Sequence, residues 1–374
     1  MHMPLVTSCF LLISHVAMTM PLVNKKRDVT MSKRVLRALA LCFLTLPSMA
    51  QTVPETEPAP PAANAPTGET GEAIPQTILV SGQRPGPGLW KVSKGDHVLW
   101  VFGIHDPLPK GMEWRSKEVE RKIAQSQEFL GAPSGGVSVG WGGGLGALPF
   151  LIGLKKNPDG ATLKDVLPPD LYERWAPLKQ KYFGDDDDIE RERPVFVAQE
   201  LYRRAKVQAG LHKGPDLREV LGKLANQHKL KYTSNKVEVE LKEPGKAARE
   251  FKKGAMADVP CLAATIAQLE TDIEAMRTRA NAWAVGELDA IEKLDYSDRE
   301  SACHNAFLSS AITKLQPELL TMQQRARDSW LAAAEKALDT NTSTFALLSM
   351  KDVLSPQGTL ARLKAKGYTV EKPN

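Results

Sequence analysis

Leu99-Trp-Val-Phe-Gly-Ile-His-Asp-Pro-Leu-Pro109 is the stretch from which the fold of this chain can be inferred. Its apolar run, residues 98–102, predicts a buried strand. Pro107 and Pro109 end this strand because a proline cannot donate a hydrogen bond to a neighbouring strand. His105 is therefore expected where the chain leaves the strand. In α/β proteins this position carries chemically active histidines and also histidines that only hold the structure together.

A hairpin and a helix are predicted on either side of this strand. Residues 90–92 and 97–102 are separated by a Ser-Lys-Gly-Asp turn, a pattern typical of a β-hairpin. After the proline loop, Ser116 is expected to cap a helix that runs to about Leu130, with two glutamates near the positive end of the helix dipole.

The remainder of the sequence predicts many helices and a few strands. Residues 258–283 predict the longest helix, because one apolar stripe of helical period runs through them to Trp283. Further helices are expected in two pieces of 162–183 and at 194–211, 216–226, 317–338 and 358–367. Strands are expected at 76–80, 230–233, 236–241, 345–350 and 368–371, with 230–233 and 236–241 joined by a turn at Ser234-Asn235.

Taken together, these elements predict an α/β (α+β) fold. We expect a mixed central sheet flanked by helices, helix-rich, with an N-terminal β-hairpin and a C-terminal β-α-β unit. The domains are expected to be an N-terminal extension and signal peptide at 1–50, a proline-rich linker at 51–88 and a folded domain at 89–374. Six prolines and almost no large apolar residue in 51–75 indicate that this linker is disordered.

The formal net charge of +5 belongs to the first 50 residues. These residues contain six Lys or Arg and one Asp, so the remaining 324 residues carry 43 basic and 43 acidic side chains. A neutral folded domain gives no support to electrostatic capture of a phosphate polymer. No nucleic-acid partner is expected.

Residues 31–50 have the three parts of a secretory signal. Met31-Ser-Lys-Arg34 is the basic region, residues 35–46 are the apolar region, and Ser48-x-Ala50 is the cleavage site. We therefore expect export to the periplasm or beyond, with cleavage after Ala50 and no stable membrane span afterwards.

Two alternatives concern this N-terminal region. A second apolar run, residues 3–23, is long enough for a transmembrane helix, but we favour a translation start at Met31 and an untranslated extension before it. Cys42 offers a site for lipidation, which the bulky Leu41 before it disfavours.

One glycine-rich stretch and one acidic stretch contain no recognisable ligand-binding motif. The glycines in 131–146 match neither G-x-G-x-x-G nor a P-loop, so a surface loop is expected there. The four aspartates at 185–188 lack the alternating ligands and central glycine of a calcium loop.

After signal cleavage two cysteines remain, Cys261 and Cys303. An even number of cysteines in an exported protein predicts a disulfide between them. The alternative is a catalytic pair of Cys303 with His304, but neighbouring residues on a helix point about 100° apart and do not face each other.

The motifs around His105 resemble those of the TraB/GumN family. Trp-Lys-Val at 90–92, the apolar strand, Ile104-His105, the proline loop and Trp114-Arg-Ser116 carry this resemblance, which extends with gaps from about Leu89 to the C-terminus. The family includes periplasmic GumN-like proteins, plasmid TraB proteins and the Tiki proteases. The chain is most similar to a divergent GumN-like member from the envelope of Gram-negative bacteria.

The resemblance also implies a metal site, which this sequence has in altered form. Relatives with a complete set of motifs have Gly-x-x-His after the first strand, an acid after the second strand and a second Gly-x-x-His near the C-terminus. Here His105 matches the first histidine, but Phe102 stands at its glycine. Ala132 stands at the acid, and Asp352 at the second histidine.

His105 and Asp352 are therefore the candidate metal ligands that the resemblance leaves. A third ligand would have to come from Glu128 or Asp106, and two ligands bind a catalytic zinc poorly. Lys351, next to Asp352, also disfavours a cation. The alternative is that His105 is a structural, hydrogen-bonded histidine.

Two hypotheses for function follow. The first is a non-catalytic envelope protein, a pseudoenzyme with a metalloprotease-like fold, that binds an unidentified envelope protein or peptide and needs no cofactor. The second is a divergent metal-dependent hydrolase or peptidase that uses His105 and Asp352 with a divalent metal.

Export predicts a defined mature N-terminus. The mature protein should begin at Gln51, because Ser48 and Ala50 provide the small residues that signal peptidase requires. N-terminal sequencing of periplasmic material checks this. Protein that still begins at Met1 or Met31 would contradict it.

Overall fold

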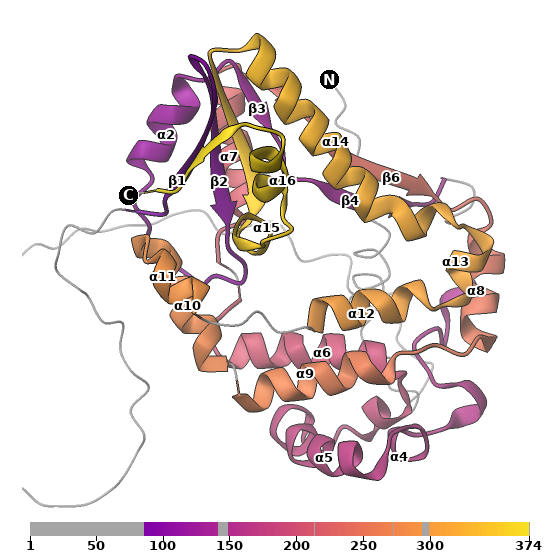
Figure 1. Ribbon diagram of the computed structural model, residues 1–374. Coiled ribbons are helices and arrows are strands. Elements are labelled where there is room, and N and C mark those ends of the chain that lie inside the picture. Colours follow the sequence, from indigo (N-terminus) through magenta and orange to yellow (C-terminus); the bar gives the residue numbers. More distant parts are fainter. Residues whose placement is uncertain (1–85, 141–148, 213, 272, 294–298, 374) are drawn as a thin grey trace, which may run out of the picture. The chain divides into compact units, whose positions relative to one another are not determined.

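Strand β2, His97–Ile104, has a neighbouring strand on each side within a six-stranded mixed sheet (Figure 1). The computed structural model describes residues 86–140, 149–212, 214–271, 273–293 and 299–373. The signal region, Cys42, most of the linker, the expected strand at 76–80 and residues 141–146 of the glycine-rich stretch lie outside the described residues. The surface loop expected at 131–146 is wrong in part, because 134–138 form a strand.

The sheet has the order β5-β3-β7-β2-β1-β8. The antiparallel pairs are β1 with β2 and β1 with β8, and the other neighbours run parallel. The strands are β1 (Leu89–Lys94), β3 (Glu128–Leu130), β5 (Lys231–Thr233), β7 (Ser343–Ser349) and β8 (Thr369–Glu371). The predicted hairpin is confirmed as β1–β2, with Leu89 opposite Phe102 and Lys94 opposite His97.

The described helices account for most of the chain between β2 and β7. They are α2 (Lys117–Ala124), α4 (Leu163–Val166), α5 (Pro169–Phe183), α6 (Pro194–Gln208), α7 (Leu217–Gln227), α8 (Pro244–Lys253), α9 (Val259–Thr271), α10 (Ile273–Val285), α11 (Leu288–Glu292), α12 (Arg299–Leu308), α13 (Ala311–Leu315) and α14 (Glu318–Thr340). After β7, α15 (Met350–Leu354) and α16 (Thr359–Ala365) lead to β8, which confirms the C-terminal β-α-β unit. The fold is thus α/β, as predicted. No helix in the described ranges is long and apolar enough to cross a membrane.

Two hydrophobic cores hold these elements. The first covers the sheet, where α14 lies against β1, β2, β3 and β7. The second lies among the helices, where α9 packs against α5, α6 and α12. Figure 1 shows α6, α9 and α12 side by side, with α5 next to α9.

Trp283 on α10 connects a helix to the centre of the sheet. Its indole Nε1 donates a 2.8 Å hydrogen bond to the carbonyl oxygen of Gly103 in β2. Its ring also packs against Phe102 and Trp114, with ring centres 5.9 and 5.8 Å apart. Gly103 permits close packing at this point, since a Cβ there would lie 3.0 Å from the Met350 methyl carbon.

The helix predicted at 258–283 is described as α9 and α10, on the two sides of residue 272, which lies outside the described residues. The apolar residues of α9 belong to the helical core, together with Met276 at the start of α10. Ala280 and Trp283 belong to the sheet core instead. The two halves of one apolar stripe thus belong to two cores.

The predicted helix from Ser116 to Leu130 ends at Ala124. Ser116 has helical backbone angles and makes no side-chain capping bond. The residues expected to form the last turn of this helix form strand β3 instead. Phe129 in this strand is buried between the rings of Tyr232 and Phe345, which lie on the neighbouring strands. The ring centre of Phe129 is 5.7 Å from the centre of each of these rings.

The two strands predicted at 230–233 and 236–241 are confirmed, but the turn predicted between them at Ser234-Asn235 is wrong. β5 pairs in parallel with β3, and the next strand, β6 (Lys236–Glu240), pairs in parallel with β4 (Ser134–Ser138). The Asn235 amide, expected in a turn, donates a 2.9 Å hydrogen bond to the Gly131 carbonyl across the strands. The chain therefore continues from β5 into β6 without reversing its direction.

The predicted pairing of Cys261 with Cys303 is confirmed in geometry. Their Cα atoms lie 4.4 Å apart and their sulfurs are at bonding distance. The pair connects α9 to α12, so it ties together two of the helices in the second core.

Trp283 should contribute strongly to stability. Trp283→Phe should lower the free energy of unfolding by about 2 kcal/mol, because it removes the bond to the buried Gly103 carbonyl and part of the packed ring. Urea denaturation measures this. Trp100→Phe is the matched control: this half-buried ring lies under the Lys122 ammonium, 3.4 Å from its centre, and its replacement should cost less than about 1 kcal/mol. Equal losses in the two variants would contradict the role assigned to Trp283.

Candidate functional site

The carboxyl ends of β2 and β7 lie at the same edge of the sheet because the two strands are parallel. Ile104, the last residue of β2, is opposite Ser349, the last residue of β7. His105 follows the first strand, and Met350 and Lys351 follow the second. In parallel sheets this edge is the usual place for a ligand.

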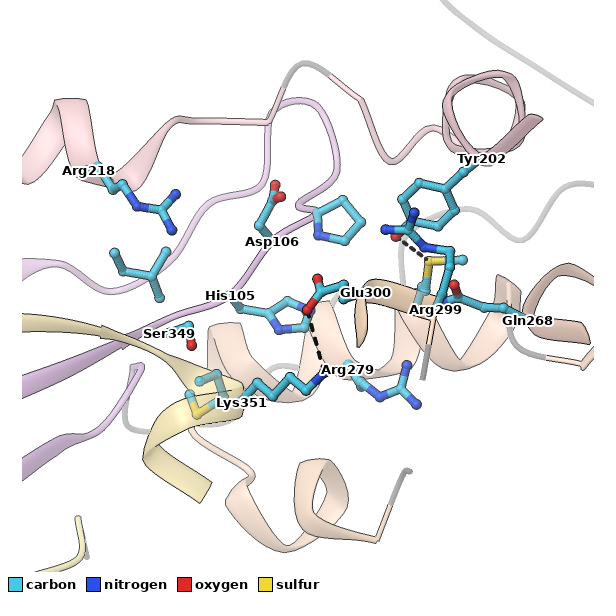
Figure 2. Close-up of a pocket in the computed structure, with 14 residues that line it drawn as sticks. His105, Asp106, Tyr202, Arg218, Gln268, Arg279, Arg299, Glu300, Ser349 and Lys351 are labelled. Carbon is cyan, nitrogen blue, oxygen red and sulfur yellow. Dashed lines mark hydrogen bonds and ion pairs between the residues drawn. The ribbon is translucent and has the colours of Figure 1, made fainter. Parts of the chain in front are cut away.

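A cavity of about 180 Å³ lies at this edge (Figure 2). His105 and Ser349 line it from the sheet, and side chains of α6, α7, α9, α10, α12 and α15 complete it. Its remaining lining residues are Ile104, Asp106, Pro107, Tyr202, Arg218, Gln268, Met276, Arg279, Arg299, Glu300, Met350 and Lys351.

Three polar side chains of this lining are almost completely buried. The exposed fractions are 5% for His105, 8% for Gln268 and 4% for Arg279. Within the described residues, neither Nε2 of His105 nor Oε1 of Gln268 has a hydrogen-bond partner. Because buried polar atoms are nearly always hydrogen-bonded, these two atoms are candidates for contact with a ligand in the cavity.

His105 is uncharged at neutral pH. Burial is the main cause that lowers its pKa, and the positive charge of Arg279 lowers it further, to about 4. A neutral imidazole can donate or accept a hydrogen bond through Nε2, depending on its tautomer.

Among the described residues that line the cavity, basic side chains outnumber acidic ones. Arg218, Arg279, Arg299 and Lys351 line it, against Asp106 and Glu300. Both acids are exposed, whereas Arg279 is buried. Figure 2 shows the ion pair of Lys351 with Glu300, whose closest atoms are 3.5 Å apart.

Tyr202 lies between charged side chains on the helical side of the cavity. The Arg299 guanidinium carbon is 3.8 Å from the centre of its ring, and the Lys206 ammonium is 4.9 Å from it. The Tyr202 hydroxyl donates to the Met276 sulfur at 3.5 Å. The guanidinium of Arg299 is thus oriented by stacking.

Asp352, the second candidate metal ligand, does not line the cavity. Its carboxylate oxygen Oδ2 accepts a 3.2 Å hydrogen bond from the Thr359 backbone at the start of α16. Its own backbone N–H donates to Oγ of Ser349, at 3.1 Å. The structure therefore uses Asp352 to hold α15 and α16, and Lys351 faces the cavity instead.

The candidate third ligands lie in different places. Glu128 is opposite Thr344, five positions before Ser349 on β7, or about 16 Å along the strand from the cavity edge. Its carboxylate is held by Thr233, by Lys231 and by Asn341. Asp106, in contrast, lines the cavity next to His105.

The residues of this cavity do not fit a catalytic metal. Nowhere in the described ranges do three His, Cys, Asp or Glu side chains converge as a metal site would require. The donor set beside His105 also contains a buried arginine, whose charge opposes a cation.

Sequence reasoning missed Gln268, Arg279 and Arg299. Arg279 did leave a signal, since it lies three positions after Met276 and four before Trp283, on the face that is otherwise apolar. A charged residue on such a face is rarely buried without a partner or a function. The other two gave no local signal.

Comparison with known proteins gives one match. The TraB/PrgY/gumN family model matches residues 88–372. No curated protein and no solved structure matches the chain significantly.

The lowered pKa of His105 makes stability depend on pH. The folded protein takes up this proton only near pH 4, whereas the unfolded chain takes it up near 6.5, so stability falls as pH decreases through this window. Between pH 7 and pH 4.5 the wild type should lose about 2.5 kcal/mol more than His105→Gln. Urea denaturation at the two pH values measures the difference.

His228→Gln is the matched control because His228 is exposed. It should lose as much stability as the wild type over the same interval. If His105→Gln and the wild type lose the same amount, the buried neutral state assigned to His105 is incorrect.

Proposed function

This chain belongs to the TraB/PrgY/gumN family, and we propose that it is an exported, non-catalytic binding protein that holds its ligand in the His105 cavity. In this proposal the cavity replaces the metal-hydrolase site that the resemblance to Tiki proteases implies. Its partner is an envelope protein, a peptide or a smaller envelope component.

One observation carries the proposal: the buried charge that acts on His105, that of Arg279, has the wrong sign for a metal site. Asp352 accepts a hydrogen bond from the Thr359 backbone, and Arg279 is buried in the lining of the cavity. A divalent cation beside an arginine is strongly disfavoured in a poorly hydrated site. The two unsatisfied atoms, on His105 and Gln268, support a bound ligand in place of a metal.

The alternative, a divergent metal-dependent hydrolase or peptidase, has one observation in its favour. Asp106 lines the cavity next to His105 and supplies a carboxylate. This enzyme would still need Asp352 to leave Thr359 and turn toward the cavity.

Export is part of the proposal. The signal-like residues 31–50 support it, as does a cysteine pair at bonding distance, because disulfides persist mainly in oxidising compartments.

Metal binding tests the proposal directly. Purified mature protein should contain no stoichiometric zinc, manganese or cobalt by elemental analysis, and these ions should not change its melting temperature. A metal at about one hundred times its dissociation constant stabilises a fold by about 2.7 kcal/mol, which would raise the melting temperature by several degrees.

His105→Ala provides the decisive variant. A stoichiometric metal in the wild type, removed by chelator and absent from His105→Ala, would overturn the proposal and favour the hydrolase. In that case Asp106→Asn and Asp352→Asn would show which carboxylate completes the site.

A further inference from the structure

We propose that the group bound in the His105 cavity is a compact oxyanion, a phosphate or a carboxylate, contacted by Arg299, Arg218 and the His105 imidazole. The inference rests on the binding function proposed above and adds the chemical class of the ligand.

The base of the cavity provides the first argument. His105 Nε2 is buried, lines the cavity and has no partner in the described chain. A buried polar atom without a partner destabilises the protein, and a ligand atom that bonds to it removes this cost. As a donor, Nε2–H would bind an oxygen that carries negative charge, and the nearby Arg279 strengthens the attraction.

The balance of charges gives the second argument. The two acids of the lining each have a cation near them: Glu300 pairs with Lys351, and Asp106 lies within electrostatic reach of Lys206 on α6. Arg218 on α7 and Arg299 on α12 add two further positive charges to the lining. Their combined field attracts an anion and repels a metal cation.

The arginines also have the right chemistry for an oxyanion. A guanidinium presents parallel N–H donors that match two oxygens of a carboxylate or phosphate. Arg299 is already oriented by its stacking on Tyr202, so less entropy is lost when it binds. In Figure 2 Arg218 and Arg299 lie on opposite sides of His105, and both line the cavity.

The volume of the cavity and the unsatisfied oxygen of Gln268 restrict the chemistry of the ligand further. A volume of about 180 Å³ holds a small molecule or one end of a larger one. Gln268 Oε1 accepts hydrogen bonds and has no partner among described residues, so the ligand should carry a donor such as a hydroxyl close to its oxyanion.

Titration of the full mature chain with two probes tests the inference. The probes are inorganic phosphate and lactate, a carboxylate with an adjacent hydroxyl, each followed by calorimetry and by melting temperature. Sodium chloride at the same ionic strength is the control for general salt effects. At least one probe should bind saturably and raise the melting temperature, and chloride should not.

Two variants locate the binding. Arg218→Gln and Arg299→Gln change an exposed and a half-buried side chain, so both should fold, and each should weaken binding about tenfold or more. Arg325→Gln on α14 is the matched control, because this arginine is exposed and lies outside the cavity lining. It should bind as the wild type does.

The outcomes separate the sources of the anion. Binding of phosphate alone identifies a phosphate ligand, and binding of lactate alone identifies a carboxylate ligand. Binding of neither probe, or binding that the Arg218 and Arg299 variants leave unchanged, would overturn the inference. This failure is distinct from that of the proposed function, which fails only if the wild type holds a metal through His105.

Discussion

Parallel pairing of β2 with β7 is the constraint on which the rest of the structure depends. Two parallel neighbours cannot be joined by a tight turn, so the chain between them must cross over and return. Residues 105–342 form this crossover, and they include nearly all of the helices. The same pairing brings His105 and Lys351 to one edge of the sheet, although they are far apart in sequence.

The crossover helices are held to the sheet at a few specific points. The Trp283 indole binds the Gly103 carbonyl in β2, just before His105. On the other side of the cavity, Lys351 pairs with Glu300 on α12, and Cys303 ties α12 to α9. These links join the helical core to the sheet, and the cavity lies where the two meet. Loss of any of these three contacts would therefore change the positions of the residues that line the cavity.

The cavity shows how a single position can change the chemistry of a site. The position at which the family resemblance implies a second histidine is Asp352, which binds the Thr359 backbone and so holds the start of α16. Lys351 turns toward the cavity, and arginines from three helices add to its positive charge. A site that favours a cation requires carboxylates directed at the histidine, and here the buried charge beside the histidine is positive.

Prediction from sequence succeeded where the signal was local. The β1–β2 hairpin follows from a turn between two apolar runs, and the position of His105 follows from the prolines after it. The long helix α14 follows from its own period, with predicted bounds that differ by two residues or fewer from those observed. Family membership follows from the same stretch of sequence.

Other features depended on contacts between distant segments. Glu128–Leu130 continues a helical pattern locally but becomes a strand, because Phe129 is buried between rings that lie far away in the sequence. The stripe ending at Trp283 is divided between two cores that only the folded chain contains.

The residues of the candidate site also fall into two groups, those that the sequence predicted and those that only the structure brought together. The sequence by itself determined the strand, the histidine that follows it and the cysteine pair, since turn chemistry, apolar period and motif spacing are properties of short segments. The tertiary structure alone decided that Arg218, Arg279 and Arg299 line one cavity with His105 and that Asp352 does not. The physical reason is that the charge of a cavity is the sum over side chains from several elements, and only packing brings those elements together.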